Sequence, residues 1–142
     1  MIVFVIDNLG PYHVARLNKI VKRECIEVLQ VFAKSCEYEW TSNQTIEFKV
    51  HTVVKKRSGR VSVGLLQKEI SRRLDEINPT HIFVSGWFSS ADLSALYWGQ
   101  FNKVPVIVMS DSQKIDFQRN RVVELGKKLL VSNFSAAFVG GS

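Results

Sequence analysis

The chain of 142 residues has few cysteines, and it lacks long hydrophobic runs and any leader-like start. Cys25 and Cys36 are its only cysteines, and their spacing is not that of a zinc site. A chain of this length buries a core without a disulfide, so we expect both thiols to be reduced. No run of about 18 apolar residues occurs, and no basic segment or small-residue cleavage site accompanies the apolar start. We therefore expect neither a membrane span nor a signal peptide, and we expect a cytoplasmic domain.

Several signatures of common enzymes are also missing. The sequence has no complete Gly-x-Gly-x-x-Gly fingerprint, no phosphate loop ending in Gly-Lys-Ser/Thr, no nucleophile elbow and no His/Cys metal spacing. Standard dinucleotide oxidoreductases and α/β-hydrolases are therefore excluded, and we expect neither a metal nor a cofactor. A phospho-acceptor receiver domain also has Asp after its first strand, but the further acidic neighbour and the Lys after its last strand are absent.

Positive charge is in excess, with 19 Lys and Arg against 13 Asp and Glu. This excess favours an anionic partner such as a nucleotide, a phosphate, a nucleic acid or an acidic membrane surface. Nucleic acid ranks last, because the tryptophans lie apart from the basic segment Lys55–Arg60. We expect this segment to be an exposed loop; a solvated loop is the simpler interpretation, and peripheral contact with an anionic membrane is the functional one.

The first 16 residues contain the clearest pattern in the chain. The apolar run Ile2–Ile6 predicts a strand buried on both faces, as in a parallel sheet. A turn containing Gly10 follows, where glycine permits an unusual backbone conformation, and Pro11 suits the first position of a helix. Val14, Leu17 and Val21 then recur at helical spacing. Together they predict a strand, a turn and a helix that packs on the sheet.

Similar units recur along the chain. Further strands are predicted over Ile26–Phe32, Ile46–Val50, His81–Ser85, Pro105–Met109 and Phe134–Val139. Only Ile46–Val50 alternates, which predicts a position near an edge with His51 pointing outward and without a role. Further helices are predicted from apolar stripes on Leu66, Ile70, Leu74 and Ile77, on Leu93, Leu96 and Tyr97, and on Val122, Leu125 and Leu129. Ser89 and Asp92 suit a capping box at the start of the middle one.

These elements predict one domain over residues 1–142, a three-layer α/β/α Rossmann-like fold with a mainly parallel, doubly wound sheet. Ile2–Ile6 is expected to be the central strand, between Ile26–Phe32 and His81–Ser85. Parallel strands place their exits on one rim, and ligands of such sheets bind beyond the carboxyl ends of the strands. Four exits are small or polar: 7–10, 85–87, 110–113 and 140–142. Each exit alone is explained by capping and turn chemistry, but four together favour a ligand-binding rim.

The segment Leu9–Leu17 resembles the Pro-Tyr-His-x-Ala-Arg-Leu opening of bacterial GT-B glycosyltransferases of the group 1, or family 4-like, type. Later segments resemble the strand exits of these proteins in the same order: Ser85–Trp87, Met109–Gln113 and Ala136–Ser142. The resemblance spans essentially the whole chain and corresponds to the N-terminal half of such an enzyme. It implies a retaining transfer from a nucleotide-sugar donor to a sugar or lipid-linked acceptor. It also implies a C-terminal, donor-binding domain, in cis or in trans, to which nothing in this sequence corresponds.

The resemblance also assigns roles to residues on the rim. His13 is the expected catalytic residue, through a hydrogen bond to an acceptor or donor hydroxyl, and Gly10 allows close approach of the ligand. Tyr12 stands at the mouth of the crevice, and Trp87 offers a face to a sugar ring. The remaining expected binding residues are Asp111 and Gln113, which orient acceptor hydroxyls, and Gly140 and Gly141. The alternative function is a non-catalytic α/β module that binds a nucleotide or a protein.

Overall fold

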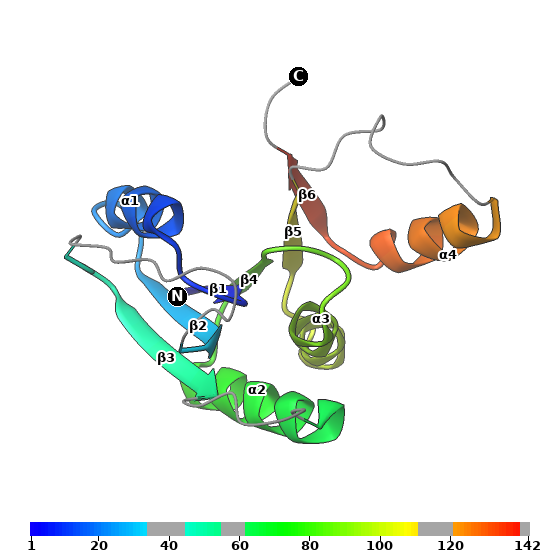
Figure 1. The fold of residues 1–142 in the computed structure, drawn as a ribbon, viewed down its shortest axis with the longest axis horizontal. Helices are drawn as coiled ribbons and strands as arrows, with labels where there is room; N and C mark the ends of the chain where they lie inside the picture. Colours follow the sequence, from blue (N-terminus) through cyan, green and yellow to red (C-terminus); the bar gives the residue numbers. More distant parts are fainter. Residues whose placement is uncertain (34–44, 55–61, 111–120, 140–142) are drawn as a thin grey trace.

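The computed structural model describes residues 1–33, 45–54, 62–110 and 121–139, which form one parallel sheet with helices on both faces (Figure 1). The strands of the sheet are β1 (Ile2–Ile6), β2 (Ile26–Phe32), β3 (Lys49–Val54), β4 (His81–Val84), β5 (Val106–Ser110) and β6 (Ala136–Val139). The helices are α1 (Pro11–Ile20), α2 (Val63–Ile77), α3 (Ser90–Asn102) and α4 (Arg121–Val131). The predicted three-layer Rossmann-like fold is therefore confirmed.

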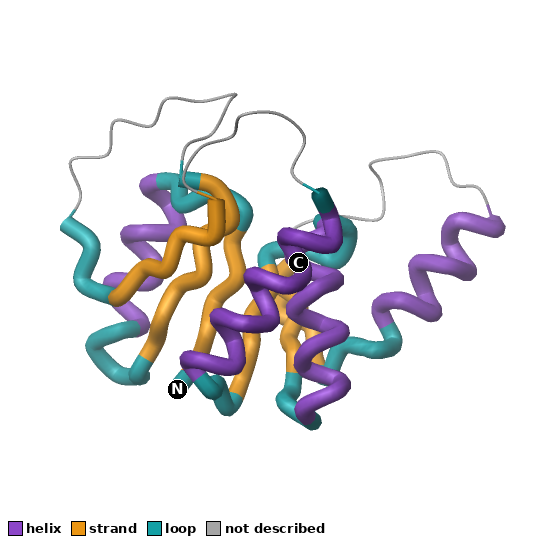
Figure 2. The backbone as a smooth tube through the Cα atoms, turned by 90° about the horizontal axis from the view of Figure 1, so that it is seen from below, coloured by secondary structure: helices purple, strands orange, loops and turns teal. Residues whose placement is uncertain are grey.

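The strand order is β3-β2-β1-β4-β5-β6, and every neighbouring pair is parallel. β1 is central, as predicted, with Phe4 aligned with Val28 of β2 on one side and with Phe83 of β4 on the other. This order is that of the dinucleotide-binding doubly wound fold. In that fold β2 and β3 are added on one side of β1, and β4, β5 and β6 are added on its other side, so the strand order reverses between β1 and β4. Figure 2 shows the strands side by side as one layer.

Two hydrophobic cores lie on opposite faces of the sheet. On one face, α1 covers Phe4, Ile6, Ile26 and Val28, mainly through Leu17. On the other face, α2 and α3 cover β1, β2, β4 and β5, and Leu130 of α4 packs at the margin of the same core. Figure 1 shows α1 on one side of the sheet and the other three helices on the opposite side. Right-handed crossovers from parallel strands require this distribution.

The third strand differs from the sequence prediction. It spans Lys49–Val54 instead of Ile46–Val50, although it is an edge strand as expected. Ile46 is exposed, whereas Phe48 is buried against α1 before the strand begins. The alternation at 46–50 therefore reflects the burial of one aromatic side chain in the approach to the strand.

The expected outward orientation of His51 is wrong. Its side chain is only 14% exposed, and its Nε2 lies 2.5 Å from Oε2 of Glu27 on the neighbouring strand. Lys49 Nζ lies 3.4 Å from the other carboxylate oxygen of Glu27. Burial alone would raise the pKa of Glu27, but the hydrogen bond from His51 and the charge of Lys49 bring it below its usual value. The sequence gives no sign of this pair, because its members are 24 positions apart.

Replacing Glu27 by Gln is expected to lower the free energy of unfolding at neutral pH by about 1 to 2 kcal/mol, because a partly buried charged hydrogen bond is lost. A depressed carboxyl pKa stabilises the folded state above the pKa of the unfolded chain, near 4.5. The difference between the wild type and Glu27→Gln should therefore shrink as the pH falls through the lower folded-state pKa. Denaturant unfolding over a pH series measures it, with the exposed Glu24→Gln as the control. A difference independent of pH would refute the ionic origin.

Helix α3 packs with a face different from the predicted one. Leu96 is buried as expected, but Leu93 and Tyr97 are exposed. The buried side consists of Ala91, Asp92, Ser94, Ala95, Leu96, Trp98 and Gly99. Because small residues recur at Ala91, Ala95 and Gly99, this side of the helix approaches the sheet closely. The apolar residues of α3 lie on all sides of the helix, so the spacing of apolar residues in the sequence could not identify the side that packs on the sheet.

Candidate functional site

The candidate site lies where β1 and β4 end, at the reversal of strand order. β1 leads into α1 on one face of the sheet, and β4 leads into α3 on the opposite face. The two connections therefore diverge, and such a point is where open α/β sheets bind ligands. The residues that follow β1 and β4 are thus brought together on one rim, as the sequence predicts for Gly10, His13 and Trp87.

Gly10 is the N-cap of α1, and Pro11 occupies the first turn as expected. The backbone of Gly10 has φ −85° and ψ 167°, which is extended conformation open to any residue. The expectation of an unusual backbone turn at Gly10 is therefore wrong. No side-chain hydrogen bond caps this helix at Gly10.

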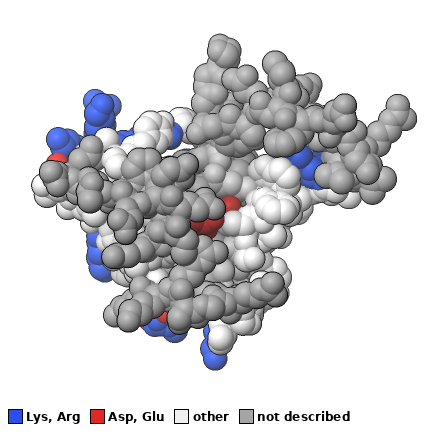
Figure 3. Space-filling model, viewed as in Figure 1, with Lys and Arg blue, Asp and Glu red and all other residues white. Residues whose placement is uncertain are grey.

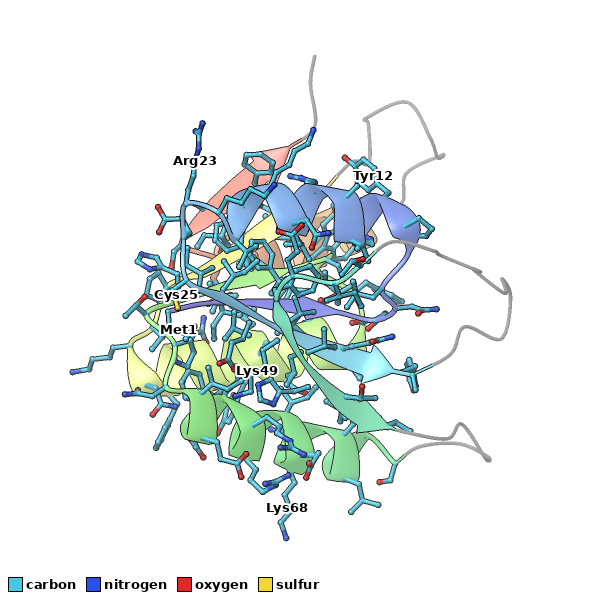
Figure 4. The ribbon with its side chains drawn as sticks, turned by 90° about the vertical axis from the view of Figure 1, so that its left-hand side faces the viewer. Met1, Tyr12, Arg23, Cys25, Lys49 and Lys68 are labelled. Carbon is cyan, nitrogen blue, oxygen red and sulfur yellow. The ribbon has the colours of Figure 1, made fainter. Side chains whose placement is uncertain are left out.

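The first turn of α1 presents its aromatic side chains at the rim. Tyr12 is 64% exposed and projects from α1 at the end opposite to Arg23 (Figure 4). The rings of Tyr12 and His13 are 5.7 Å apart in an edge arrangement, and His13 is half-buried. The Arg16 guanidinium lies 5.1 Å from the ring centroid of Phe138 in β6, which places α1 close to β6. His13 therefore lies next to the switch point on a helix held by the core.

Trp87 follows β4 and is half-buried against the core on the α2–α3 face. Lys127 Nζ of α4 lies 4.8 Å from the centroid of its ring, and the exposed Phe88 meets it edge-on. Lys127 therefore occupies one face of the Trp87 ring. A sugar can stack on the opposite face of this ring, or on the same face after Lys127 moves.

Four expected site residues lie outside the described residues. Asp111 and Gln113 follow β5, which ends at Ser110, and Gly140 and Gly141 follow β6, which ends at Val139. Both strands are parallel to β1 and β4, so their carboxyl ends point to the same rim. The basic segment Lys55–Arg60 also lies outside the described residues.

Sequence reasoning missed a group at the centre of the rim, formed by Asp7, Ser89 and Asp92, which we name the switch-point cluster. Ser89 is the N-cap of α3 and accepts a hydrogen bond of 3.1 Å from the backbone N–H of Asp92, so the predicted capping box is confirmed. The Ser89 hydroxyl also donates to Asp7 Oδ1 at 3.5 Å, across 82 positions of sequence. Three residues from two strand exits therefore meet at one point.

Asp92 is the most buried member of the switch-point cluster, with 3% of its surface exposed. Its carboxylate accepts the backbone N–H groups of Ser89 and Gly86, while its Oδ1 has no hydrogen-bond partner among the described residues. A Cβ at Gly86 would lie 3.2 Å from Asp92 Oδ2, so the turn after β4 closes tightly over this carboxylate. Asp92 thus ties the exit of β4 to the start of α3.

Burial raises the pKa of both carboxyls in the cluster. Desolvation, assisted by the charge of Asp7, raises the pKa of Asp92 to about 6 against the lowering effect of Ser89 and Gly86. Desolvation also raises the pKa of Asp7, against the lowering effect of the Ser89 hydrogen bond. No cation pairs with either carboxyl within the described residues. Among the described residues, the cluster therefore carries negative charge without a cation partner.

Figure 3 shows the charged side chains on one face of the surface. Its largest group of acidic atoms lies near the middle of the view, where Figure 1 places β1 and β4, and smaller acidic groups lie beside Lys and Arg atoms at the left and lower margins. In the described ranges no group of three or more His, Cys, Asp or Glu residues has the arrangement of a metal site. The same ranges contain no helix long and apolar enough to cross a membrane. The described residues at the rim offer carboxylates at Asp7 and Asp92, the Ser89 hydroxyl and the His13 ring.

Comparisons with known proteins agree with this architecture. No protein-family model matches the chain, and no curated protein matches it. Among solved structures it is similar to the UDP-N-acetylglucosamine 2-epimerase from Rickettsia bellii, with a TM-score of 0.61 and 15% identity over 96% of this chain. It is also similar to the UDP-GlcNAc 2-epimerase from Methanocaldococcus jannaschii, with a TM-score of 0.56 and 13% identity over 99% of this chain.

The chain spans 38% of the length of each of these proteins. At these identities the likeness concerns the fold, which is GT-B-like and Rossmann-type in both neighbours. The GT-B-like architecture implied by the sequence motifs is therefore confirmed at the level of the fold, while the family 4-like subdivision stays a prediction. The chain therefore shares the fold of a portion of these two enzymes.

Proposed function

We propose that residues 1–142 form the N-terminal, acceptor-side domain of a glycosyltransferase that transfers a sugar from a nucleotide-sugar donor, with retention. The observation that carries this proposal is the position of the Leu9–Leu17 segment. It begins α1 beside the reversal of strand order, on the fold found in enzymes that act on nucleotide sugars. The donor-binding domain, in the same chain or in a partner, would close the crevice from the other side.

The rim suits positioning and electrostatics more than proton chemistry. A retaining displacement develops charge on the leaving diphosphate, which donors at a helix N-terminus and cations can stabilise. The N-terminus of α1 lies at the rim without a side-chain cap, and Arg16 lies one turn further along the helix. His13, in the first turn, would orient a hydroxyl of the donor or acceptor. Gly10, Tyr12, Trp87, Asp111, Gln113, Gly140 and Gly141 complete the proposed site.

A one-sided rim leaves a nucleotide sugar largely in water, whereas displacement at a sugar carbon needs donor and acceptor held together in a partly dry cleft. The 142-residue chain alone is therefore expected to transfer no sugar. It should gain activity when joined to a donor-binding domain. In the active two-domain protein, His13→Ala should lower turnover by about 100-fold through loss of a transition-state hydrogen bond.

His81→Ala is the matched control for His13→Ala. His81 is exposed at the start of β4, at the opposite end of the sheet, and contacts the Thr80 hydroxyl at 3.2 Å. His51 is unsuitable, since its removal would break the pair with Glu27. Product formation is followed by mass spectrometry with a panel of nucleotide sugars and acceptors. Sugar transfer by the isolated chain at enzymatic rates, or equal turnover in His13→Ala and His81→Ala, would refute the proposal.

A second candidate function is favoured by the comparisons, because both structural neighbours are 2-epimerases of UDP-GlcNAc. The same assay separates the two activities. An epimerase converts the nucleotide sugar without an acceptor, whereas a transferase releases free nucleotide only when an acceptor is present. A two-domain protein that does neither, but binds nucleotide in calorimetry, would identify the chain as a non-catalytic binding module.

A membrane-bound acceptor is a further part of the proposal. Lipid-linked acceptors require the acceptor-side domain to approach an anionic surface, to which each Lys or Arg contributes about 1 kcal/mol. The segment Lys55–Arg60 supplies such charges, so it would assist attachment without causing it alone.

A further inference from the structure

We propose that the switch-point cluster of Asp7, Ser89 and Asp92 binds hydroxyl groups of a sugar, which under the proposed function is the acceptor. This inference rests on the proposed function only for the identity of the sugar as acceptor. The cluster itself is defined by contacts of the described residues.

The first step is the missing hydrogen-bond donor. Asp92 Oδ1 is buried and has no partner in the described part of the chain. A buried carboxylate oxygen without a donor is destabilising, because the hydrogen bonds that it made to water in the unfolded chain are not replaced. The capping box does not require this cost, because Ser89 and Gly86 donate to the carboxylate while Oδ1 is left without a partner. The unsatisfied oxygen marks the cluster as a place where donors are supplied from outside.

The second step is the free capacity of Asp7. A carboxylate has about four acceptor positions, whereas Asp7 receives from the described side chains only the long hydrogen bond of 3.5 Å from Ser89. Asp7 is half-buried at the end of β1, so part of its side chain is accessible at the rim, whereas Asp92 is 3% exposed. Both carboxylates therefore have acceptor positions for a ligand, Asp7 at its half-buried side chain and Asp92 at its unpartnered Oδ1.

The third step concerns the class of the ligand. Two carboxyls that have no cation partner among the described residues repel a phosphate, so the cluster would receive an uncharged part of a substrate. The Ser89 hydroxyl already donates its one hydrogen to Asp7 and accepts from Asp92, which leaves one acceptor position for a sugar hydroxyl. A divalent cation is less suited, because Ca²⁺ takes about six to eight oxygen ligands and Mg²⁺ demands near-octahedral geometry. The described residues offer two carboxylates and one hydroxyl here.

The experiment is a titration of the ¹⁵N-labelled 142-residue chain with glucose, galactose, mannose and N-acetylglucosamine, followed through amide chemical shifts. At least one sugar is expected to give saturable shifts at residues 7–10 and 85–90 with a dissociation constant in the millimolar range, about −4 kcal/mol. Asp7→Asn should weaken binding by about tenfold, while Glu24→Gln, an exposed carboxylate change at the opposite end of the sheet, should leave it unchanged.

Asp7→Glu is the second variant if Asp7→Asn loses its dispersed spectrum. It keeps the charge but moves the carboxylate by one methylene, and it should also weaken binding. Unaltered affinity in both variants, shifts confined to other residues, or no shifts with any sugar would overturn the proposal. So would Mg²⁺ or Ca²⁺ that shifts the same amides and competes with the sugar.

The outcome is separable from that of the proposed function. Sugar binding that depends on Asp7, in a two-domain protein without transferase activity, would support this inference and refute the transferase. Sugar transfer that is unaffected by Asp7→Asn would support the transferase and refute this inference.

Discussion

Replacing Gly99 by alanine is expected to lower the free energy of unfolding by about 2 kcal/mol, although alanine is the better helix former. A Cβ at this position in α3 would lie 2.3 Å from Val106 Cγ2 and 2.9 Å from the Val104 carbonyl oxygen. Val106 is buried and β-branched, and Val104 presents its backbone, so neither can move cheaply. Overpacking of this kind costs about 3 kcal/mol, and the gain in helix propensity returns only about 1.

Gly126→Ala is the matched control, because Gly126 lies within α4 and a Cβ there meets nothing within 4 Å. This variant should raise stability by up to about 1 kcal/mol. Denaturant unfolding of both variants tests the prediction, because the free energy of unfolding should fall in Gly99→Ala and rise in Gly126→Ala. If Gly99→Ala were as stable as the wild type, α3 would not need to lie as close to β5 as the structure places it.

The close approach of α3 also matters for the site, since α3 begins at Ser89 and Asp92. A helix that is displaced at Gly99 carries its N-terminus with it, and the Ser89 contact to Asp7 is already long at 3.5 Å. Gly99→Ala should therefore perturb amide shifts around residues 85–90 as well as around 99–106. Core packing at one end of α3 thereby fixes the geometry at the other.

The sheet was largely predictable from the sequence. Strands buried on both faces favour apolar runs. Ile2–Ile6 is a continuous run of this kind, and Ile26–Phe32 is rich in Ile, Val and Leu although it contains Glu27 and Gln30. The capping box at Ser89 was also visible, because it depends on residues three positions apart. The apolar character of Ile2–Ile6 predicted a central strand. The structure confirms this position, because β1 pairs in parallel with β2 on one side and with β4 on the other.

Properties that depend on distant pairs were not predictable. His51 was expected to point outward, but its partner Glu27 lies on the next strand, and nothing local to either residue indicates the pair. The packed side of α3 was missed for a related reason. Leu93 and Tyr97 are larger and more apolar than Ala91 and Ala95, yet the close distance to the sheet selects the small residues.

The candidate site divides in the same way. Gly10, His13 and Trp87 could be placed on one rim, because parallel strands force their exits together. Asp7 and Asp92 were not recognised as a pair, since Asp92 has a complete local explanation as a capping residue. Only the fold brings the exit of β1 beside the start of α3 and reveals that the two carboxyls share a buried position.

Asp92 is expected to make the folded state less stable as the pH rises from about 4 to about 7. Its pKa is raised from 3.8 to about 6, chiefly by desolvation. Between these values the unfolded chain has released the proton that the folded chain still holds, so the free energy of unfolding falls with rising pH. A difference of about two pKa units corresponds to about 3 kcal/mol at neutral pH. Glu27 and Glu69, whose pKa values are lowered, act in the opposite direction at lower pH.

Because these contributions overlap, the measurement is the difference between the wild type and Asp92→Asn over a pH series. The amide keeps an acceptor for the backbone N–H of Ser89 but carries no charge, so the variant should gain stability relative to the wild type as the pH rises from about 4 to about 7. Asp7→Asn removes the neighbouring charge that contributes to the raised pKa of Asp92. In this variant the fall in the free energy of unfolding with rising pH should therefore end at a lower pH than in the wild type. Glu24→Gln should change neither the slope nor its midpoint. A constant difference between the wild type and Asp92→Asn would show that Asp92 titrates alike in the folded and unfolded chains, which contradicts a carboxyl held out of water.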